Sequence, residues 1–285
     1  MSTMLEDKNW RALHKGEGIL NEANNNVTRI TVVVAVYNGA KTLQTCLDSI
    51  NGQTHQIREL IIIDGGSTDG TVEIVKKNSL KISYWESSPD RGIYHAWNKA
   101  LTHATGDWVY FLGADDVLHD QYVLEKFVSK MREVAIPPLV AYGKIEYCKG
   151  DKRRVMGEEW RKIRYKIKSG MYIRHQGMFH HKNLFVKCGR FDERYQIAGD
   201  YHLLLRSLRY DLPIFLGDFI IADQYAGGKS SERASRWKVL REFRAAQKEM
   251  GLPLTIRWVW EYTKAQMWRC FMIKQWWLSK TAGAR

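Results

Sequence analysis

Continuous apolar runs alternate with helix-like spacing in the first half of the chain. The runs Ile30–Val36 and Leu60–Ile63 are rich in β-branched residues, which is typical of strands that are covered on both faces. Residues 81–85 and 108–112 predict two further strands. Between these runs, apolar residues recur every three or four positions, which predicts helices. This alternation indicates an open, mostly parallel α/β sheet flanked by helices.

The second half of the chain predicts a mixture of elements and a helical end. We expect a helix over residues 120–132, short strands within 139–147, a basic loop, further segments at 175–180, 199–210 and 214–223, and helices over 231–250 and 252–280. Residues 1–28 have no sustained period and form an N-terminal extension. The expected organisation is therefore one α/β domain over residues 29–228, divided at residues 117/118, followed by a C-terminal helical extension over 229–285.

Composition supports a folded protein without disulfides. The 285 residues are 45% hydrophobic and contain four cysteines that lie far apart in the sequence, which is enough chain for a large core and argues against a disulfide scaffold or a zinc ribbon. The first residues lack the apolar stretch of a secretory signal, and no apolar run is long enough to span a bilayer. We expect a cytoplasmic protein with reduced thiols.

The net charge of +13 is concentrated in two segments. Residues 151–174 contain nine Lys/Arg and three Asp/Glu, a balance of +6, and residues 228–285 contain thirteen and four, a balance of +9. Because these add to +15, the rest of the chain carries about −2. The basic segments therefore look like additions to a nearly neutral core, and they indicate contact with an anionic partner.

Carboxylates follow the predicted strands at the points where the strands end. They are Asp64, Asp90 and the pair Asp115–Asp116, and ligands of parallel α/β sheets bind at this edge. Hard oxygen ligands favour Mg²⁺ or Mn²⁺. Taken alone, the Asp pair also fits a capping pair before the next helix, and Asp64 also fits a turn. A Walker lysine motif and a Gly-x-Gly-x-x-Gly motif are both absent from the sequence, which argues against a P-loop NTPase or a standard dinucleotide-binding enzyme.

Four motifs together carry a resemblance to a known family. Val34–Asn38 (VAVYN), Ile63–Gly70 (IDGGSTDG), Ser88–Tyr94 (SPDRGIY) followed by Asn98–Lys99, and Phe111–Asp116 (FLGADD) occur in this order. Their residues and spacing resemble those of the family 2 glycosyltransferases with a GT-A (Rossmann-like) fold. The resemblance is strongest to the members that build bacterial surface polysaccharides such as colanic acid. The resemblance covers about residues 29–228.

The resemblance implies an inverting, metal-dependent transfer of a hexosyl or N-acetylhexosaminyl group from a nucleotide-sugar, commonly a UDP-sugar. Residues 29–117 would bind the donor and residues 118–228 would face the acceptor. Nucleotide-sugar contacts fall on Ala35, Tyr37, Asp64, Asp90, Arg91 and Asp115. The implied Mn²⁺ or Mg²⁺ would bind to Asp116, with Asp115 on the metal or the ribose. A metal at this place would stabilise the charge of the leaving diphosphate.

Residues on the acceptor side are implied in the same way. Asp200, in the segment Gly-Asp-Tyr, matches the family's catalytic base, although an N-cap role fits it too and Gly199 replaces the family's more usual second acid. His175 and Gln176 resemble an acceptor-side motif, whereas a lone histidine is equally often structural. His95 stands where related sequences often have Asp, which fits either a change of donor or a solvent-facing residue.

The aromatic end of the chain indicates a membrane surface. Residues 252–280 contain five of the 11 tryptophans among basic residues, a composition that favours the lipid headgroup layer. We therefore expect peripheral attachment to the anionic inner leaflet of a bacterial plasma membrane and a lipid-linked glycan acceptor, while packing onto the catalytic domain or in a homo-oligomer is the alternative. A scaffold of this fold that binds nucleic acid or membrane is the competing function, but nucleic acid is not an expected partner because it leaves the four motifs unexplained.

Overall fold

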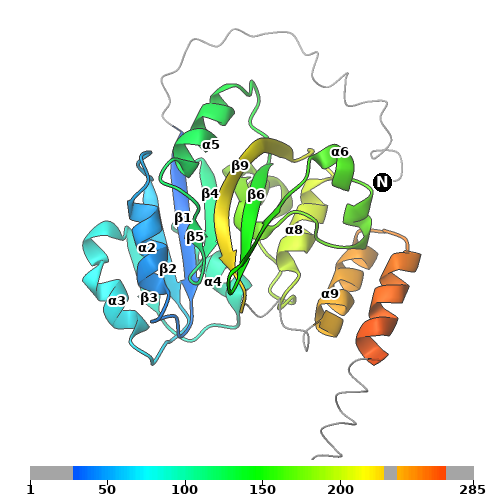
Figure 1. Cartoon of the computed structure of the whole chain (residues 1–285), viewed down its shortest axis with the longest axis horizontal. Coiled ribbons are helices and arrows are strands. Elements are labelled where there is room, and N and C mark those ends of the chain that lie inside the picture. Colours follow the sequence, from blue (N-terminus) through cyan, green and yellow to red (C-terminus); the bar gives the residue numbers. More distant parts are fainter. Residues whose placement is uncertain (1–27, 228–235, 268–285) are drawn as a thin grey trace, which may run out of the picture.

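The computed structural model describes residues 28–227 and 236–267. Its strands are β1 (Ile30–Val36), β2 (Glu59–Asp64), β3 (Tyr84–Ser87), β4 (Trp108–Gly113), β5 (Val117–Leu118), β6 (Val140–Lys149), β7 (Lys152–Met156), β8 (Met178–His181) and β9 (Ile214–Tyr225). They form one sheet in the order β3-β2-β1-β4-β8-β6-β9-β5, with β7 paired to β6. This sheet crosses the centre of the molecule in Figure 1.

The first four strands of the sheet order run parallel to one another. β1 pairs with β2 on one side and with β4 on the other, and β3 extends the parallel run beyond β2. β8 then joins β4 and β6 in antiparallel fashion, whereas β6 and β9 are parallel. Consequently the loops that follow β1, β2 and β4 leave the sheet at the same edge.

Helices cover both faces of the sheet. They are α2 (Leu43–Asn51), α3 (Thr71–Lys77), α4 (Ile93–Ala100), α5 (Val123–Arg132), α6 (Trp160–Ile163), α7 (Lys182–Cys188), α8 (Gly199–Ser207) and α9 (Arg236–Glu249), and residues 256–267 are also helical. α2 and α3 lie on one side of the molecule, and α6, α8 and α9 lie on the other (Figure 1).

Alternation along β1 divides the core into two apolar clusters. Val32 and Val34 lie in the cluster that contains Leu47 of α2 and Phe127 of α5. Val33 points to the other face and lies in a separate cluster with residues of α4, α8 and α9. Successive side chains of a strand point to opposite faces, so the unbroken apolar run in β1 supplies both clusters.

The expected α/β class and the mostly parallel sheet with flanking helices are confirmed. Several boundaries were wrong: the strand expected over residues 81–85 is β3 at Tyr84–Ser87, and the helix expected from residue 120 begins at Val123. The expected short strands within 139–147 are one long strand, β6, and the basic loop after it contains β7. β7 is exposed and rich in Lys and Arg, so it lacks the apolar pattern by which a strand is recognised.

The C-terminal helices pack onto the α/β domain. Ala246, Met250 and Leu252 belong to the same apolar cluster as Val33. The last helix begins at residue 256 rather than 252, and the part of the expected helix beyond residue 267 lies outside the described residues. Within residues 28–227 and 236–267, no helix has the length and apolarity needed to cross a bilayer. The expected domain boundary at 228/229 stays a prediction.

Phe111 offers a test of the core. Its side chain is fully buried in β4, with ring contacts to Trp97, His175 and Phe191. We expect Phe111→Ala to lower the free energy of unfolding by about 3–5 kcal/mol because it leaves a cavity. Urea unfolding measures this. Leu80→Ala is the control, since Leu80 is fully exposed and should change stability by less than about 0.5 kcal/mol; equal losses in the two variants would contradict the packing described.

Candidate functional site at the strand ends

The register of three strands places the candidate site. Ala35 of β1 is the partner of Ile63 in β2 and of Gly113 in β4, and Val36 is the partner of Asp64. The three strands therefore end almost level with one another. The motifs that follow these strands in the sequence converge at this edge because the loops after all three strands begin there.

The loops after β1 and β2 are joined by hydrogen bonds. The Asn38 backbone N–H donates to Ser67 Oγ at 2.7 Å, and the Thr68 N–H donates to Asn38 Oδ1 at 3.0 Å. Asn38 adopts a left-handed backbone with φ of 51°, which asparagine tolerates better than most residues. Beside it, Tyr37 is 63% exposed, so its ring is accessible at the edge.

Asp64 shapes the loop that follows it. Its buried carboxylate accepts hydrogen bonds from the Gly66 N–H at 3.1 Å, the Ser67 N–H at 2.9 Å and Ser87 Oγ at 2.5 Å, and from the Ser67 hydroxyl. All of these donors belong to the protein. A direct contact of Asp64 with a nucleotide base stays a prediction.

Asp90 occupies the space above Gly65. A Cβ at Gly65 would lie 2.9 Å from Asp90 Oδ2 and 3.4 Å from the ring of Tyr37, so glycine lets the two side chains approach. The Gly92 N–H holds the other Asp90 oxygen at 2.8 Å. Next to it, the exposed Arg91 forms an ion pair with Glu193 at 2.5 Å. The predicted donor residues Ala35, Tyr37, Asp64 and Asp90 therefore share one edge.

Asp115 and Asp116 converge at the end of β4. A Cβ at Gly113 would lie 2.7 Å from Asp116 Oδ2 and 2.9 Å from Asp115 Oδ1, so both carboxylates gather over this glycine. Asp115 is exposed, whereas Asp116 is buried and accepts a hydrogen bond from the Tyr225 N–H at 2.9 Å. Burial, and then the charge of Asp115, raise the pKa of Asp116 to about 7. Two converging carboxylates of this kind fit a hard divalent cation.

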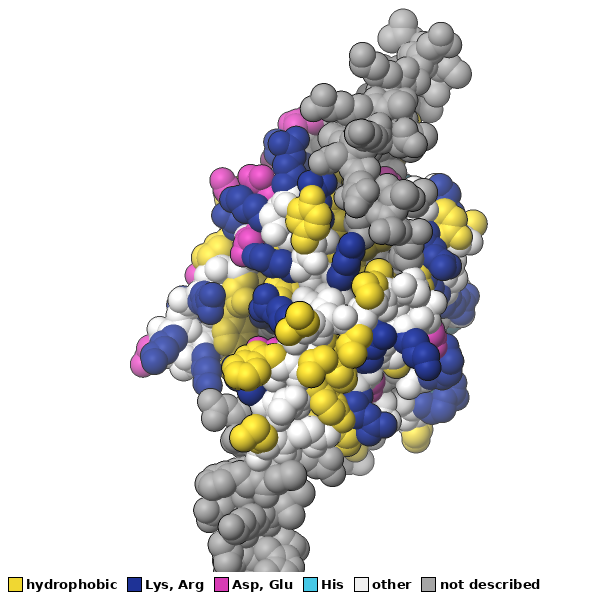
Figure 2. All heavy atoms as spheres, turned by 90° about the vertical axis from the view of Figure 1, so that its right-hand side faces the viewer, with side chains coloured by type: hydrophobic (Ala, Val, Ile, Leu, Met, Phe, Trp, Pro, Cys, Tyr) yellow, Lys and Arg dark blue, Asp and Glu magenta, His cyan; other side chains and the backbone are white. Residues whose placement is uncertain are grey.

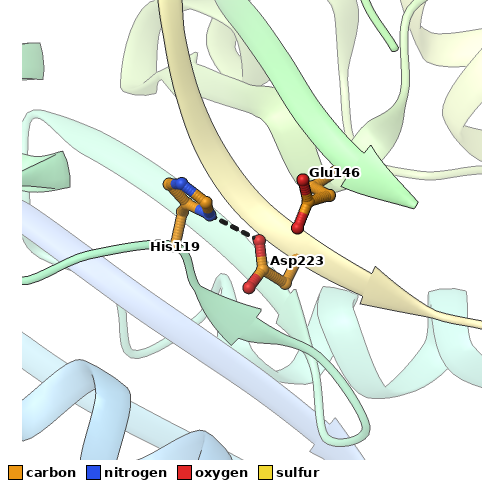
Figure 3. Close-up of side chains that lie close together, drawn as sticks. All are labelled: His119, Glu146 and Asp223. Carbon is orange, nitrogen blue, oxygen red and sulfur yellow. Dashed lines mark hydrogen bonds and ion pairs between the residues drawn. The ribbon is translucent and has the colours of Figure 1, made fainter. Parts of the chain in front are cut away.

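A second group of metal-ligating side chains lies nearby. His119, Glu146 and Asp223 come from the end of β5, from β6 and from β9 (Figure 3), and each offers an atom within 4.8 Å of the others. His119 Nδ1 lies 2.6 Å from Asp223 Oδ1. The charge of Asp223 contributes to the raised pKa of Asp116, so the two groups belong to one electronegative region. Sequence reasoning missed this group because strand pairing alone brings its members together.

Asp200 stands at the start of α8. Its Oδ1 accepts a hydrogen bond from the Tyr201 N–H at 2.7 Å and lies 3.3 Å from the Tyr94 hydroxyl. Burial raises the pKa of Asp200 to about 6. A Cβ at Gly199 would lie 2.8 Å from the Tyr94 ring, which explains why this chain has glycine before the aspartate. α4 begins at the strand-end edge, and its Tyr94 therefore links that edge to Asp200.

Glu242 of α9 holds the loop that leads into Asp200. Its carboxylate accepts hydrogen bonds from the backbone N–H groups of Gln196 at 3.1 Å, Ile197 at 2.8 Å and Ala198 at 2.9 Å. These donors would otherwise be unpaired next to a helix start. No sequence pattern predicts this role, since Glu242 lies in a highly charged helix far along the chain.

His175 and Gln176 occupy different environments. His175 is buried in the core, where its ring stacks on Trp97 at 4.5 Å between centroids, and burial holds its pKa well below the usual value. The Gln176 side chain lies close enough to Asp116 to favour its ionised carboxylate and so lower its pKa. Gln176 thus belongs to the site, whereas His175 packs in the core against Trp97. The acceptor-side roles of both residues stay predictions.

The contacts of Glu242 predict an electrostatic effect on Asp200. Glu242→Gln removes a negative charge that helps raise the pKa of Asp200, so we expect that pKa to fall below about 6, as measured by NMR titration of the carboxyl carbon. Weaker hydrogen bonds to the loop should also cost about 1–2 kcal/mol of unfolding free energy. Glu249→Gln, on the same helix, is the control because Glu249 contacts His202 and Arg194 instead. A larger pKa change in the control would contradict the assignment.

Sequence comparisons find relatives in mycobacteria. A PGL/p-HBAD biosynthesis glycosyltransferase of Mycobacterium bovis is 31% identical over 179 residues, covering 62% of this chain and 68% of the relative. An uncharacterized glycosyltransferase of Mycobacterium tuberculosis is 29% identical over 180 residues, with the same coverage of 62% and 68%.

Solved structures share the fold. S. aureus TarS 1–349 in complex with UDP-GlcNAc matches with a TM-score of 0.61 at 19% identity, covering 76% of this chain and 66% of that one. The mannosyltransferase PcManGT from Pyrobaculum calidifontis, in complex with GDP-Man and Mn²⁺, matches with a TM-score of 0.60 at 20% identity, covering 90% and 74%. The expected GT-A architecture is thereby confirmed. The family model described as Glycosyl transferase family 2 matches residues 31–193, more than half of the 285 residues, and the chain therefore belongs to glycosyl transferase family 2.

Proposed function

We propose that the protein moves a sugar, with inversion at the anomeric carbon, from a nucleotide-sugar to a lipid-linked oligosaccharide or surface-polysaccharide acceptor. The observation that carries this proposal is the pairing of two carboxylate sites. Asp115 and Asp116 converge at the end of β4, while Asp200 lies beside Tyr94 of α4, which begins at the same edge. One site suits the leaving diphosphate and the other suits the acceptor hydroxyl.

The strand-end loops suit the donor. The exposed ring of Tyr37 offers a stacking surface for a base, and Ala35 and Asp90 border the same edge. Arg91 is held toward Glu193 by an ion pair and offers its charge to a diphosphate. We propose UDP as the nucleotide and a hexosyl or N-acetylhexosaminyl group as the sugar. TarS is described with UDP-GlcNAc and PcManGT with GDP-Man, so GDP is the first alternative.

A divalent cation fits the carboxylates of Asp116 and Asp115. Their oxygens are the hard ligands that Mn²⁺ and Mg²⁺ prefer. Burial, and then the charge of Asp115, raise the pKa of Asp116, and a cation would offset both effects. When bound, the metal would supply positive charge to the leaving diphosphate. Gln176 and the Tyr225 N–H orient Asp116 for this purpose. PcManGT is described with Mn²⁺, which supports the choice of ion.

Asp200 is the proposed catalytic base. The acceptor oxygen attacks the anomeric carbon, the bond from that carbon to the diphosphate oxygen breaks, and the hydroxyl proton passes to the Asp200 carboxylate. A single displacement of this kind inverts the configuration. A pKa of about 6 leaves Asp200 ionised at neutral pH but more basic than an exposed aspartate, which suits proton abstraction. Glu242 and Tyr94 fix its position.

We further propose that the enzyme works on the cytoplasmic face of a bacterial plasma membrane, where its C-terminal helices bring it to a lipid-linked acceptor. The exposed apolar residues of the helix over 256–267 support attachment to a membrane. The competing function is an inactive scaffold. The carboxylates of Asp116 and Asp200, both with pKa values raised by burial, favour the enzyme, because a scaffold has no use for such groups.

Nucleotide binding tests the metal site. In calorimetry with Mn²⁺, we expect the protein to bind UDP and to lose binding in EDTA. Asp116→Asn should weaken binding at least about tenfold, or about 1.4 kcal/mol. Asp218→Asn is the matched control because Asp218 is exposed and pairs only with Lys144. Binding that survives both EDTA and Asp116→Asn would contradict the metal site. A preference for GDP or dTDP would change the assigned nucleotide and leave the metal site in place.

The pH dependence of turnover tests Asp200. Because the base must be ionised, kcat should rise with pH through about 6, the pKa of Asp200, and level off above it. Asp200→Asn should lower kcat by about 10²–10⁴-fold with UDP affinity unchanged, since Asp200 stands on α8 and not in the strand-end loops. An Asp200→Asn enzyme that keeps its turnover and the same acidic limb would show that another group is the base.

A further inference from the structure

The two basic segments meet at one side of the folded molecule, although residues 175–227 separate them in the sequence. The guanidinium of Arg257 lies 5.6 Å from the ring centre of Tyr172, and the ammonium of Lys166 lies 6.0 Å from the same ring. Gly170 packs against the ring of Phe243 in α9. The segment 151–174 and the C-terminal helices therefore form a single cationic face.

The helix over residues 256–267 has one packed side and one apolar side that is open. On the packed side, Trp258 Nε1 donates to the Leu240 carbonyl of α9 at 2.8 Å, and Ala265 is buried. The opposite side carries four exposed apolar residues at helical spacing of three, four and seven positions: Ile256 (89% exposed), Val259 (44%), Trp260 (60%) and Met267 (70%). We call these four residues the apolar stripe.

Positive charges border the apolar stripe. Lys264 lies 4.6 Å from the ring centre of Trp260, and Arg257 stands on the same flank of the helix beside Tyr172. Figure 2 views this side of the molecule and shows hydrophobic side chains interspersed with Lys and Arg and with few acidic residues. Large apolar side chains in water are costly, and cations around them favour an anionic partner.

We propose that the apolar stripe, together with Arg257, Lys264 and Lys166, docks the enzyme onto an anionic phospholipid surface. The occupant follows from the chemistry of the face. A lipid headgroup layer accepts tryptophan and aliphatic side chains and offers phosphates to the bordering cations. Nucleic acid would match the charge but would leave Ile256 and Val259 in water. The inference extends the proposed function, whose acceptor lies in a membrane, by naming the residues that meet it.

The position of α9 connects this face to the catalytic base. Leu240 of α9 contacts the docking helix, while Glu242, two residues along and on the other side of α9, holds the loop before Asp200. α9 alone thus lies between the docking helix and the loop of the base. Because a helix with its side chains is about 10 Å across, docking through the apolar stripe would hold the loop before Asp200 two helix layers, roughly 20 Å, from the lipid.

Vesicle binding by the full chain tests the proposal without any donor or acceptor. The protein should cosediment with vesicles of phosphatidylcholine and phosphatidylglycerol, should bind weakly to phosphatidylcholine alone, and should be released by salt. The double variant Ile256→Glu/Trp260→Glu should lose binding, and Arg257→Gln and Lys264→Gln should each weaken it by roughly fivefold. Leu80→Glu is the matched control, because Leu80 is equally exposed but lies after α3 on the other side of the molecule.

Three outcomes would overturn the proposal: a wild-type chain that does not bind anionic vesicles, a stripe variant that binds as well as wild type, or a dimer in solution that the stripe variant dissociates, which would make the occupant a second copy. Circular dichroism and unfolding midpoints establish that the variants fold. UDP binding is measured separately, so a failure of docking and a failure of the transferase assignment are distinguished.

Discussion

The level ends of β1, β2 and β4 are the constraint on which the site depends. Parallel pairing fixes Ala35 opposite both Ile63 and Gly113, so three loops must leave the sheet at one edge. A slip of one residue in β1 would exchange the faces of Val32 and Val33 and bury neither correctly. The two apolar clusters therefore hold the register, and the register in turn brings Asp64, Asp90, Asp115 and Asp116 together.

Burying carboxylates costs free energy, because the charged form loses its hydration. Burial and neighbouring charges raise the pKa values of Asp116 and Asp200 to about 7 and about 6, so each site favours positive charge, which suits the proposed cation at Asp116 and the proposed proton transfer to Asp200. The two carboxylates have separate supports. Asp116 accepts a hydrogen bond from the Tyr225 N–H and lies beside Gln176, whereas Asp200 depends on Tyr94 and on the loop held by Glu242. Two carboxylate sites with separate supports can act on opposite ends of one reaction.

The sequence predicted what lies close along the chain. Strand-end motifs made Asp115, Asp116 and Asp90 recognisable because motif, strand and loop are local features. Contacts between distant segments were beyond its reach: Glu242 binds a loop more than 40 residues earlier, and His119, Glu146 and Asp223 meet only through the pairing of β5, β6 and β9. β7 was missed because an exposed strand of Lys and Arg has no apolar alternation.

The C-terminal helices show how an appended segment becomes part of the catalytic unit. α9 gives Ala246 to the core, Glu242 to the loop of Asp200 and the Leu240 carbonyl to the following helix. A helix whose side chains were all buried in the fold would have no surface with which to bind a partner. Here, within the described residues, the following helix packs through the side of Trp258 and Ala265, while Ile256, Trp260 and Met267 on the opposite side are exposed. The same pair of helices can therefore hold the loop before Asp200, the proposed base, on one side and present the proposed lipid-docking surface on the other.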